Sequence, residues 1–355
     1  MLLAAGAFIA VLGLAIVGVV IGYGRKSGPP RGDAAVAVDW PPGLDSEQAA
    51  ERLVSLGLAS DREAMTMFFR ATGGTSDFVA GPHLLPTAAT PWDLRRLLSR
   101  SFFRPNVKLT VPEGYNRFDI ASRLEKLKIA SRGAFLAASV EPALLDEVGV
   151  PRGESGPAES VEGYLFPATY ELPIDSDPRD VLRRLAEEAT RRWEILVAAR
   201  NDGLESLRAT LGWGRREVLT LASIIEKEAA VDDERPLIAS VFLNRLLDPV
   251  FRPKRLQSDP TSLYGCLTAP AEAPSCADFN GKPSPAINHD PKNRYSTYTH
   301  NGLPPGPIAN PGARSIEAVL APAATRYFYF VATGGGRHTF SQDLDAHNDA
   351  VHRGK

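Results

Sequence analysis

The sequence predicts an α+β protein built from an N-terminal transmembrane helix, a small α+β region and a C-terminal mixed α/β domain. Three observations support this class: residues 2–23 carry no charge, strand-like and helix-like segments alternate through the middle, and helical patterns dominate after residue 176. With 355 residues, 44% hydrophobic and 23% charged, the chain is long enough for about two globular domains. The predicted parts are residues 1–23, 24–35, 36–175 and 176–355.

Composition excludes some partners. The formal net charge is −2, without the basic excess that binds a polyphosphate backbone, so we expect no nucleic acid partner. The two cysteines, Cys266 and Cys276, lack the paired spacing and neighbouring histidines of a zinc site, and we expect no metal and no cofactor. In an oxidising compartment these cysteines could close a short disulfide loop.

Residues 2–23 are dominated by Ala, Val, Leu, Ile and Gly. At ~1.5 Å per residue such a helix crosses a ~30 Å hydrocarbon core, which favours a transmembrane anchor. A cleaved signal peptide is the alternative, but a charged start and a clear small-x-small cleavage site are missing. Arg25 and Lys26 follow the helix, and the positive-inside rule would place the body in the cytoplasm. Residues 24–35 form a Gly- and Pro-rich flexible tether.

The region 36–175 contains a degenerate repeat of strand, Pro-x-Gly turn and amphipathic helix. The two copies occupy residues 36–56 and 107–127. Further helices are predicted at residues 61–70 and 90–99, the second capped by Thr90 with Pro91 at its first position. Repeats of this kind resemble the LysM modules that lie along cell-wall glycan strands, and a small α+β domain without a ligand is the alternative.

Residues 162–170 concentrate aromatic side chains and a proline. Aromatic faces stack on sugar rings, but they also close small cores, and we expect the core role here. A long helix over residues 178–201 and a short one before Gly212 then lead into the C-terminal domain.

Residues 219–230 form an apolar helical run in which the first carboxylate is Glu226. On a helical wheel Glu226 lies beside a buried stripe, where a carboxyl is partly removed from water and is suited to donate a proton. Glu228, on the other border of the stripe, fits the wheel almost as well. The wheel alone therefore leaves both residues open.

Polar residues that follow this helix are candidates for substrate positioning. Asn244 lies along an apolar seam of a helix predicted over residues 234–247, and it needs a hydrogen-bond partner, which could be backbone. Residues 256–265 are polar and turn-rich, with Asp259 as the expected helix N-cap. Residues 295–312 are too rich in Pro and Gly for regular structure, and a short helix over 315–320 and a hairpin over 327–340 follow. The candidates are Asn244, Gln257, Ser258, Asp259, Thr261 and Tyr298.

At this point the sequence resembles the endolytic murein transglycosylase family (YceG-like, MltG type). The strings that carry the resemblance occur in order between residues 219 and 348: ASIIEKEA, VFLNRL, LQSDPTSLYG, YSTYTHNGLPPGPIANPG, YFYFVA and HTFSQDLDAHN. The chain departs from the family pattern at Ser296, where Asn is common, and in the stretch 266–294, an insertion that carries both cysteines.

The resemblance implies a single-pass inner-membrane protein with its body in the periplasm. It also implies that Glu226 is the single acid/base of a lytic transglycosylase, that peptidoglycan glycan strands are the substrate, and that penicillin-binding protein synthases are partners. Two alternatives remain: a lysozyme-type hydrolase that uses Glu226 with Asp259 or Glu228 as base, and a glycan-binding scaffold without activity.

Overall fold

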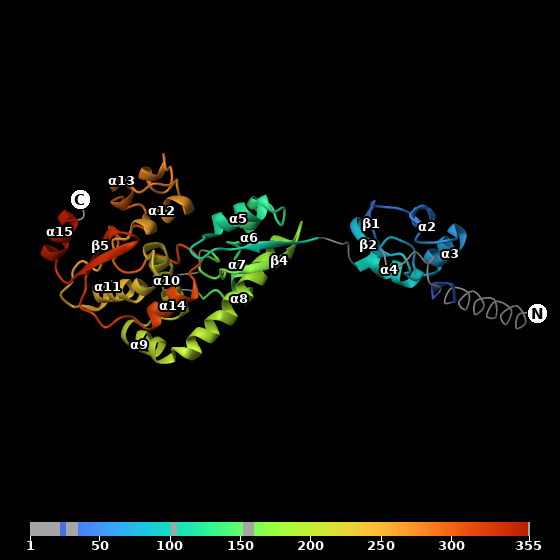
Figure 1. Cartoon of the computed structure of the whole chain (residues 1–355). Helices are drawn as coiled ribbons and strands as arrows, with labels where there is room; N and C mark the ends of the chain where they lie inside the picture. The colour runs from blue at the N-terminus through green and yellow to red at the C-terminus, as the bar shows by residue number, and fades with distance from the viewer. Residues whose placement is uncertain (1–21, 26–34, 101–104, 152–159, 354–355) are drawn as a thin grey trace, which may run out of the picture. The chain divides into compact units, whose positions relative to one another are not determined.

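The computed structural model describes residues 22–25, 35–100, 105–151 and 160–353. The chain divides into two compact units, Met1–Pro105 and Asn106–Lys355 (Figure 1). Both units mix helices with antiparallel strand pairs, so the α+β class is confirmed.

In its described residues, the smaller unit combines one antiparallel strand pair with helices α2, α3 and α4. Strand β1 runs antiparallel to β2, with Val38 opposite His83. Its core contains Trp40, Leu53, Phe68 and Leu94, all at most 2% exposed. The elements are β1 (Ala35–Trp40), α2 (Ser46–Ser55), α3 (Arg62–Ala71), β2 (Gly81–Pro86) and α4 (Pro91–Arg100).

The larger unit begins with a second strand pair surrounded by helices. Strands β3 and β4 are antiparallel, with Leu109 opposite Tyr170. The elements of this part are β3 (Asn106–Thr110), α5 (Arg117–Lys126), α6 (Arg132–Ala138), α7 (Pro142–Glu147), β4 (Thr169–Pro173), α8 (Pro178–Ala199) and α9 (Asn201–Leu211).

The remainder of the larger unit surrounds α10 (Arg215–Glu228), which packs against α11 (Arg235–Leu247), α12 (Asp259–Thr268) and α14 (Ala313–Leu320) (Figure 1). Strands β5 (Tyr329–Gly334) and β6 (Arg337–Ser341) form the predicted hairpin. The other elements are η1 (Asp232–Glu234), η2 (Pro274–Cys276), α13 (Pro285–Asn288) and α15 (Leu344–Arg353).

Both copies of the predicted repeat form a strand and a helix. Helices α2 and α5 each begin with a capping box, Asp45 with Gln48 and Asn116 with Asp119, which satisfies backbone N–H groups that the first turn leaves free. The copies fall in different units, and each strand pairs with a strand outside the repeat.

The predicted boundary between residues 175 and 176 does not coincide with the boundary between the units, which follows Pro105. The reason is a shared core: Leu109, Tyr164 and Leu185 belong to the same buried cluster as Ile225 and Val319. Within it Tyr164 and Tyr170 are 2% and 4% exposed, so the core role expected for residues 162–170 is confirmed.

Two details at helix ends differ from expectation. Ser258, not Asp259, occupies the N-cap position of α12, and Asp259 starts the helix. Helix α11 starts at Arg235, because η1 occupies the preceding residues.

The predicted anchor, residues 2–23, lies almost wholly outside the described residues. Among the helices that the structure does describe, none has the length and apolar character required to cross a bilayer.

Candidate functional site

Helix α10 ends in two carboxyl groups that face different surroundings. Every residue of this helix from Val218 to Ile225 is buried, so its C-terminal turn is held firmly in the larger unit. Glu226 and Glu228 follow, and residues two positions apart on a helix point in nearly opposite directions. Each carboxyl therefore has its own set of partners.

Glu226 is bound by three donors. Its Oε1 accepts from Arg235 Nη2 at 3.1 Å, and its Oε2 accepts from Gly312 N at 3.0 Å and Ser315 Oγ at 2.7 Å. The Glu226 side chain is only 6% exposed and that of Arg235 8%. All three partners donate to the Glu226 carboxyl, which forms a buried ion pair with Arg235.

Glu113, from the Pro-Glu-Gly turn after β3, lies close to the same pair. Its carboxyl occupies the space where a side chain on Gly312 would begin, with Oε1 2.0 Å from the position of such a Cβ atom. Partial burial raises the pKa of Glu113, and the negative charge of Glu226 raises it further.

Glu228 has a different environment. Its Oε1 accepts one hydrogen bond, from Ser258 Oγ at 2.5 Å. Burial raises the pKa of Glu228 above the usual range of a carboxyl, and the charge of Asp259 adds to this, while the Ser258 hydrogen bond, His338 and Arg245 oppose it. Glu228 is therefore the carboxyl at the end of α10 whose surroundings favour a retained proton.

Asp259 and Tyr298 form a pair next to Glu228. Tyr298 Oη donates to Asp259 Oδ1 at 2.6 Å, and Asn288 Nδ2 donates to the same oxygen at 2.7 Å. Burial raises the pKa of Tyr298, and its hydrogen bond to Asp259 raises it further, so the phenol keeps its proton.

A frame of buried hydroxyls holds this group in place. Ser258 N donates to Thr297 Oγ1 at 2.9 Å, and Thr261 Oγ1 donates to the Ser258 carbonyl at 2.6 Å. Ser258, Thr261 and Thr297 are at most 1% exposed. Gln257 is exposed beside them with a left-handed φ of 56°, a conformation that costs a non-glycine residue of order 1 kcal/mol and recurs at functional sites.

The Asn244 side chain bonds to backbone, which is one of the two possibilities that the sequence left open. Its Nδ2 donates to the carbonyls of Thr325 at 3.1 Å and Tyr327 at 2.9 Å, which fastens α11 to the segment before β5. The neighbouring Arg245 is buried, its Nε donates to the Phe328 carbonyl at 2.7 Å, and burial lowers its pKa to about 10.

Among the predicted candidates, the structure therefore brings Ser258, Asp259, Thr261 and Tyr298 together, with Gln257 beside them. They gather at Glu228, whereas Glu226 faces Arg235 and Ser315. Sequence reasoning missed Asn288, Thr297 and Arg235. The helical wheel placed both Glu226 and Glu228 at the border of a buried stripe. The two carboxyls differ in their side-chain partners, which are distant in sequence.

His338 and Glu234 form a further buried pair in the larger unit. His338 Nδ1 lies 2.7 Å from Glu234 Oε2, and the His338 backbone N donates to Oε1 at 3.1 Å. In the described part of the chain, no cluster of three or more His, Cys, Asp or Glu residues is placed to hold a metal ion.

This fold and site define an α+β protein with a partly buried carboxyl of raised pKa, next to a second carboxyl and to hydroxyl donors. The chain belongs to the YceG-like family, whose model matches residues 38–353. It is 35% identical over 193 residues to a Bacillus subtilis protein named endolytic murein transglycosylase, covering 54% of this chain and 47% of that protein. A Streptococcus pneumoniae protein of the same name is 27% identical over 316 residues, covering 84% of this chain and 54% of the relative.

The chain thus spans about half the length of these curated relatives. A crystal structure of a putative yceG-like protein from Listeria monocytogenes matches with a TM-score of 0.54 at 27% identity, covering 90% of this chain and 99% of that one.

Proposed function

We propose that this protein is an endolytic lytic transglycosylase that cleaves the β-1,4 bond between N-acetylmuramic acid and N-acetylglucosamine within peptidoglycan strands. The product is a strand that ends in 1,6-anhydro-N-acetylmuramic acid. The names of the relatives support this reaction. The observation that carries the proposal is a partly buried carboxyl, Glu228, with a raised pKa and a hydroxyl partner at 2.5 Å.

The acid role has two candidates. Glu226 is the residue that the sequence resemblance implies, yet its carboxylate is engaged by a guanidinium, a backbone amide and a hydroxyl. Glu228 has a single side-chain donor and surroundings that favour the protonated form. The geometry therefore supports Glu228 as the acid/base, with Glu226 as the alternative that experiment must separate.

The chemistry needs one carboxyl. The proton of Glu228 passes to the glycosidic oxygen as the C1–O bond of the muramic residue breaks. The 6-hydroxyl oxygen of the same sugar bonds to C1, and its proton passes to the Glu228 carboxylate, which restores the acid. No water is consumed. Ser258 and the Asp259–Tyr298 pair would orient the carboxyl and the sugar.

Two matched variants test this assignment. We expect Glu228→Gln to abolish release of 1,6-anhydro-muropeptides from purified glycan, because an amide cannot deliver the proton. Glu226→Gln, the matched control, should retain turnover but lose thermal stability, because it removes the buried carboxylate that pairs with Arg235 and leaves this guanidinium with the more exposed Asp232 as its partner. Loss of product in Glu226→Gln with full turnover in Glu228→Gln would transfer the acid role to Glu226.

A second candidate function is lysozyme-type hydrolysis. It is favoured by Asp259, a second carboxyl whose charge acts on Glu228 and which could activate water. Mass spectrometry of the digested strands separates the two reactions, because hydrolysis leaves reducing ends heavier by one water. A scaffold without activity would bind sacculi and yield neither product.

The proposal extends to the cell envelope. An anchor over residues 2–23 would hold the protein in the inner membrane with its body in the periplasm, and residues 36–175 would contribute LysM-like contacts to glycan. Cleavage near the membrane would end the elongation of nascent strands, with penicillin-binding protein synthases as partners.

A further inference from the structure

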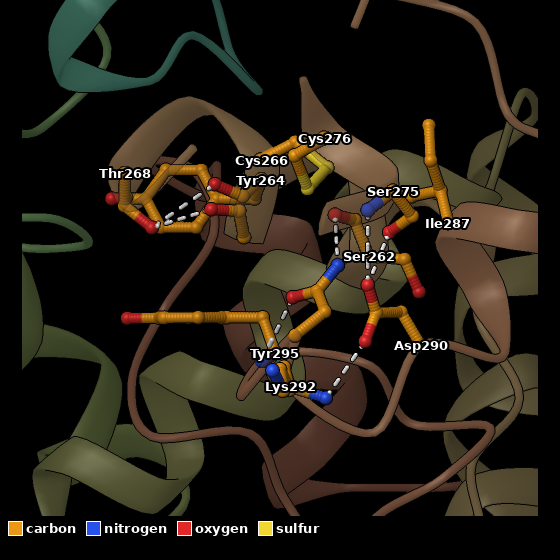
Figure 2. The surroundings of a disulfide bond; sticks show 12 residues. Ser262, Tyr264, Cys266, Thr268, Ser275, Cys276, Ile287, Asp290, Lys292 and Tyr295 are labelled. Carbon is orange, nitrogen blue, oxygen red and sulfur yellow. Dashed lines mark hydrogen bonds between the residues drawn. A yellow bond between two sulfur atoms is a disulfide. The ribbon is translucent and has the colours of Figure 1, made fainter. Parts of the chain in front are cut away.

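The segment between α12 and α14 is closed by a disulfide bond. Cys266, in the C-terminal half of α12, is bonded to Cys276 of η2, with their Cα atoms 5.2 Å apart (Figure 2). The two cysteines pack with Ala273 and Ile287 in a small core of their own, each at most 5% exposed. The disulfide therefore fixes the position of α13, on which Ile287 lies.

A second set of bonds ties this segment to the chain before Tyr298. Asp290 Oδ2 accepts from Ser275 Oγ at 2.7 Å and from Ser275 N at 3.1 Å (Figure 2). Asn293 Nδ2 donates to the Ser262 carbonyl at 2.9 Å, and Ser296 Oγ donates to the Asn288 carbonyl. The disulfide and these hydrogen bonds together cross-link residues 266–296 into one structure.

Asn288 links this structure to the candidate site. It follows Ile287 directly, is 8% exposed, and its Nδ2 donates to Asp259 Oδ1 at 2.7 Å. The same Asp259 oxygen receives the Tyr298 hydroxyl at 2.6 Å. The ring of the next residue, His289, lies 5.3 Å from the ring of Tyr298. The disulfide-closed segment therefore touches both members of the Asp259–Tyr298 pair.

The direction of the Asn288 side chain follows from chemistry. Asp259 Oδ1 acts as an acceptor towards Tyr298, so the Asn288 amide can bond to it only through its nitrogen, which is a donor. The Asn288 Oδ1 atom is buried without a hydrogen-bond partner. Burying an unpaired carbonyl costs roughly 1 to 3 kcal/mol, so packing alone does not account for an amide at this position.

We propose that Asn288 is a positioning residue that orients Asp259 for the reaction, and that the Cys266–Cys276 disulfide holds Asn288 in place. This inference rests on the proposed function, because the rate it affects is that of glycan cleavage. Reduction of the disulfide by a dithiol adds two electrons and two protons, giving two thiols, and would release α13 together with Asn288.

Three variants separate positioning from packing. We expect Asn288→Leu, which keeps the volume but removes the donor, to lower kcat about tenfold with little change in KM, as for one lost hydrogen bond to a charged group. Asn288→Asp keeps the shape of Asn but sets a carboxylate against Asp259, so it should lose more than Asn288→Leu. Asn280→Leu, in the exposed part of the same segment, should match the wild type.

A packing role predicts the reverse order, with the nearly isosteric Asn288→Asp milder than Asn288→Leu. That order, or unchanged turnover in both variants, would overturn the proposal. Thermal unfolding of each variant in the full-length chain checks that the rate changes are not losses of folded protein.

The effect of the disulfide on turnover can be tested in protein that keeps Asn288. Treating the wild-type protein with dithiothreitol should lower turnover several-fold, with recovery on reoxidation, and Cys266→Ala/Cys276→Ala should be equally slow and insensitive to the reagent. Reduced protein that retains full turnover would refute the role of the disulfide. A wild-type protein that yields no cleavage product at all would instead contradict the proposed function, so the two failures are distinguishable.

Discussion

Glu226 and Glu228 stand two positions apart on one helix, yet their chemistry is set by residues far away in sequence. Arg235 and Ser315 donate hydrogen bonds to the first carboxyl, while burial raises the pKa of the second, which bonds to Ser258. Protonating Glu226 would weaken its buried ion pair with Arg235, whose other carboxylate partner, Asp232, is more exposed. This contrast is why we propose Glu228 as the acid.

Another buried carboxyl, Glu162, has a structural role. Glu162 is 2% exposed, accepts the Arg117 backbone N–H through both oxygens at 3.1 and 2.9 Å, and also accepts from Tyr264 and Asn310. It thereby joins the start of α5 to α12 and to the Pro-rich loop. Burial raises the pKa of Glu162 to about 7, although its four hydrogen bonds favour the charge.

This shift predicts a pH-dependent stability. Because the folded pKa lies above the unfolded value of 4.5, the protonated form is favoured by folding, and its contribution is lost as pH rises from about 4.5 to 7. The free energy of unfolding should fall by about 3 kcal/mol over this window from Glu162 alone.

Urea denaturation at pH 5 and pH 8 measures this effect. Glu162→Gln should be less stable at pH 5, having lost an acceptor, but should show a smaller drop between the two values. The exposed Glu171→Gln on β4 serves as the matched control and should follow the wild type. Equal drops in wild type and Glu162→Gln would contradict the assignment.

At the scale of elements, the close approach of α9 to the end of α14 depends on Gly203. A Cβ atom at Gly203 would lie 1.8 Å from the carbonyl oxygen of Leu320, and this atom belongs to the backbone, so it cannot turn away. Gly133, on α6, is also helical and has nothing within 4 Å of its Cβ position.

We therefore expect Gly203→Ala to destabilise the larger unit by about 1 to 3 kcal/mol through overpacking. Gly133→Ala should be neutral or stabilising by up to about 1 kcal/mol, because alanine favours a helix. Thermal unfolding compares the two. A Gly203→Ala protein as stable as Gly133→Ala would mean that α9 moves away from α14 at no cost.

Elements were the part of the fold most accessible to sequence reasoning. Helices α3, α4, α8 and α10 lie within a few residues of their expected positions, because Asp61, Pro91 and Pro178 are strong local start signals. Strand β4 and helices α6, α7, α13 and α15 were not anticipated. They are short or weakly periodic, and β4 acquires its identity only from pairing with β3.

For the whole molecule, the central prediction concerns residues 2–23, whose uncharged sequence favours an anchor. In cell fractionation the full chain should remain in the membrane pellet after a high-salt or carbonate wash, whereas deletion of residues 2–23 should release it. A deletion of equal length that runs into β1 would not serve as a control, because β1 is part of the first core. Replacing residues 2–23 by an unrelated transmembrane helix should restore the pellet, and wild-type protein in the soluble fraction would contradict the anchor.

By itself the sequence determined the α+β class, the order of the longer helices, and the repeat of strand, turn and helix. These follow from periodicity, capping and turn chemistry, which act over a few residues. Only the tertiary structure decided where the units divide and which carboxyl carries which partners. Those outcomes depend on contacts that α10 and α12 make with residues distant in sequence, namely Arg235, Ser258, Asn288 and Ser315. Burial and hydrogen bonding between such distant residues leave no local pattern in the sequence.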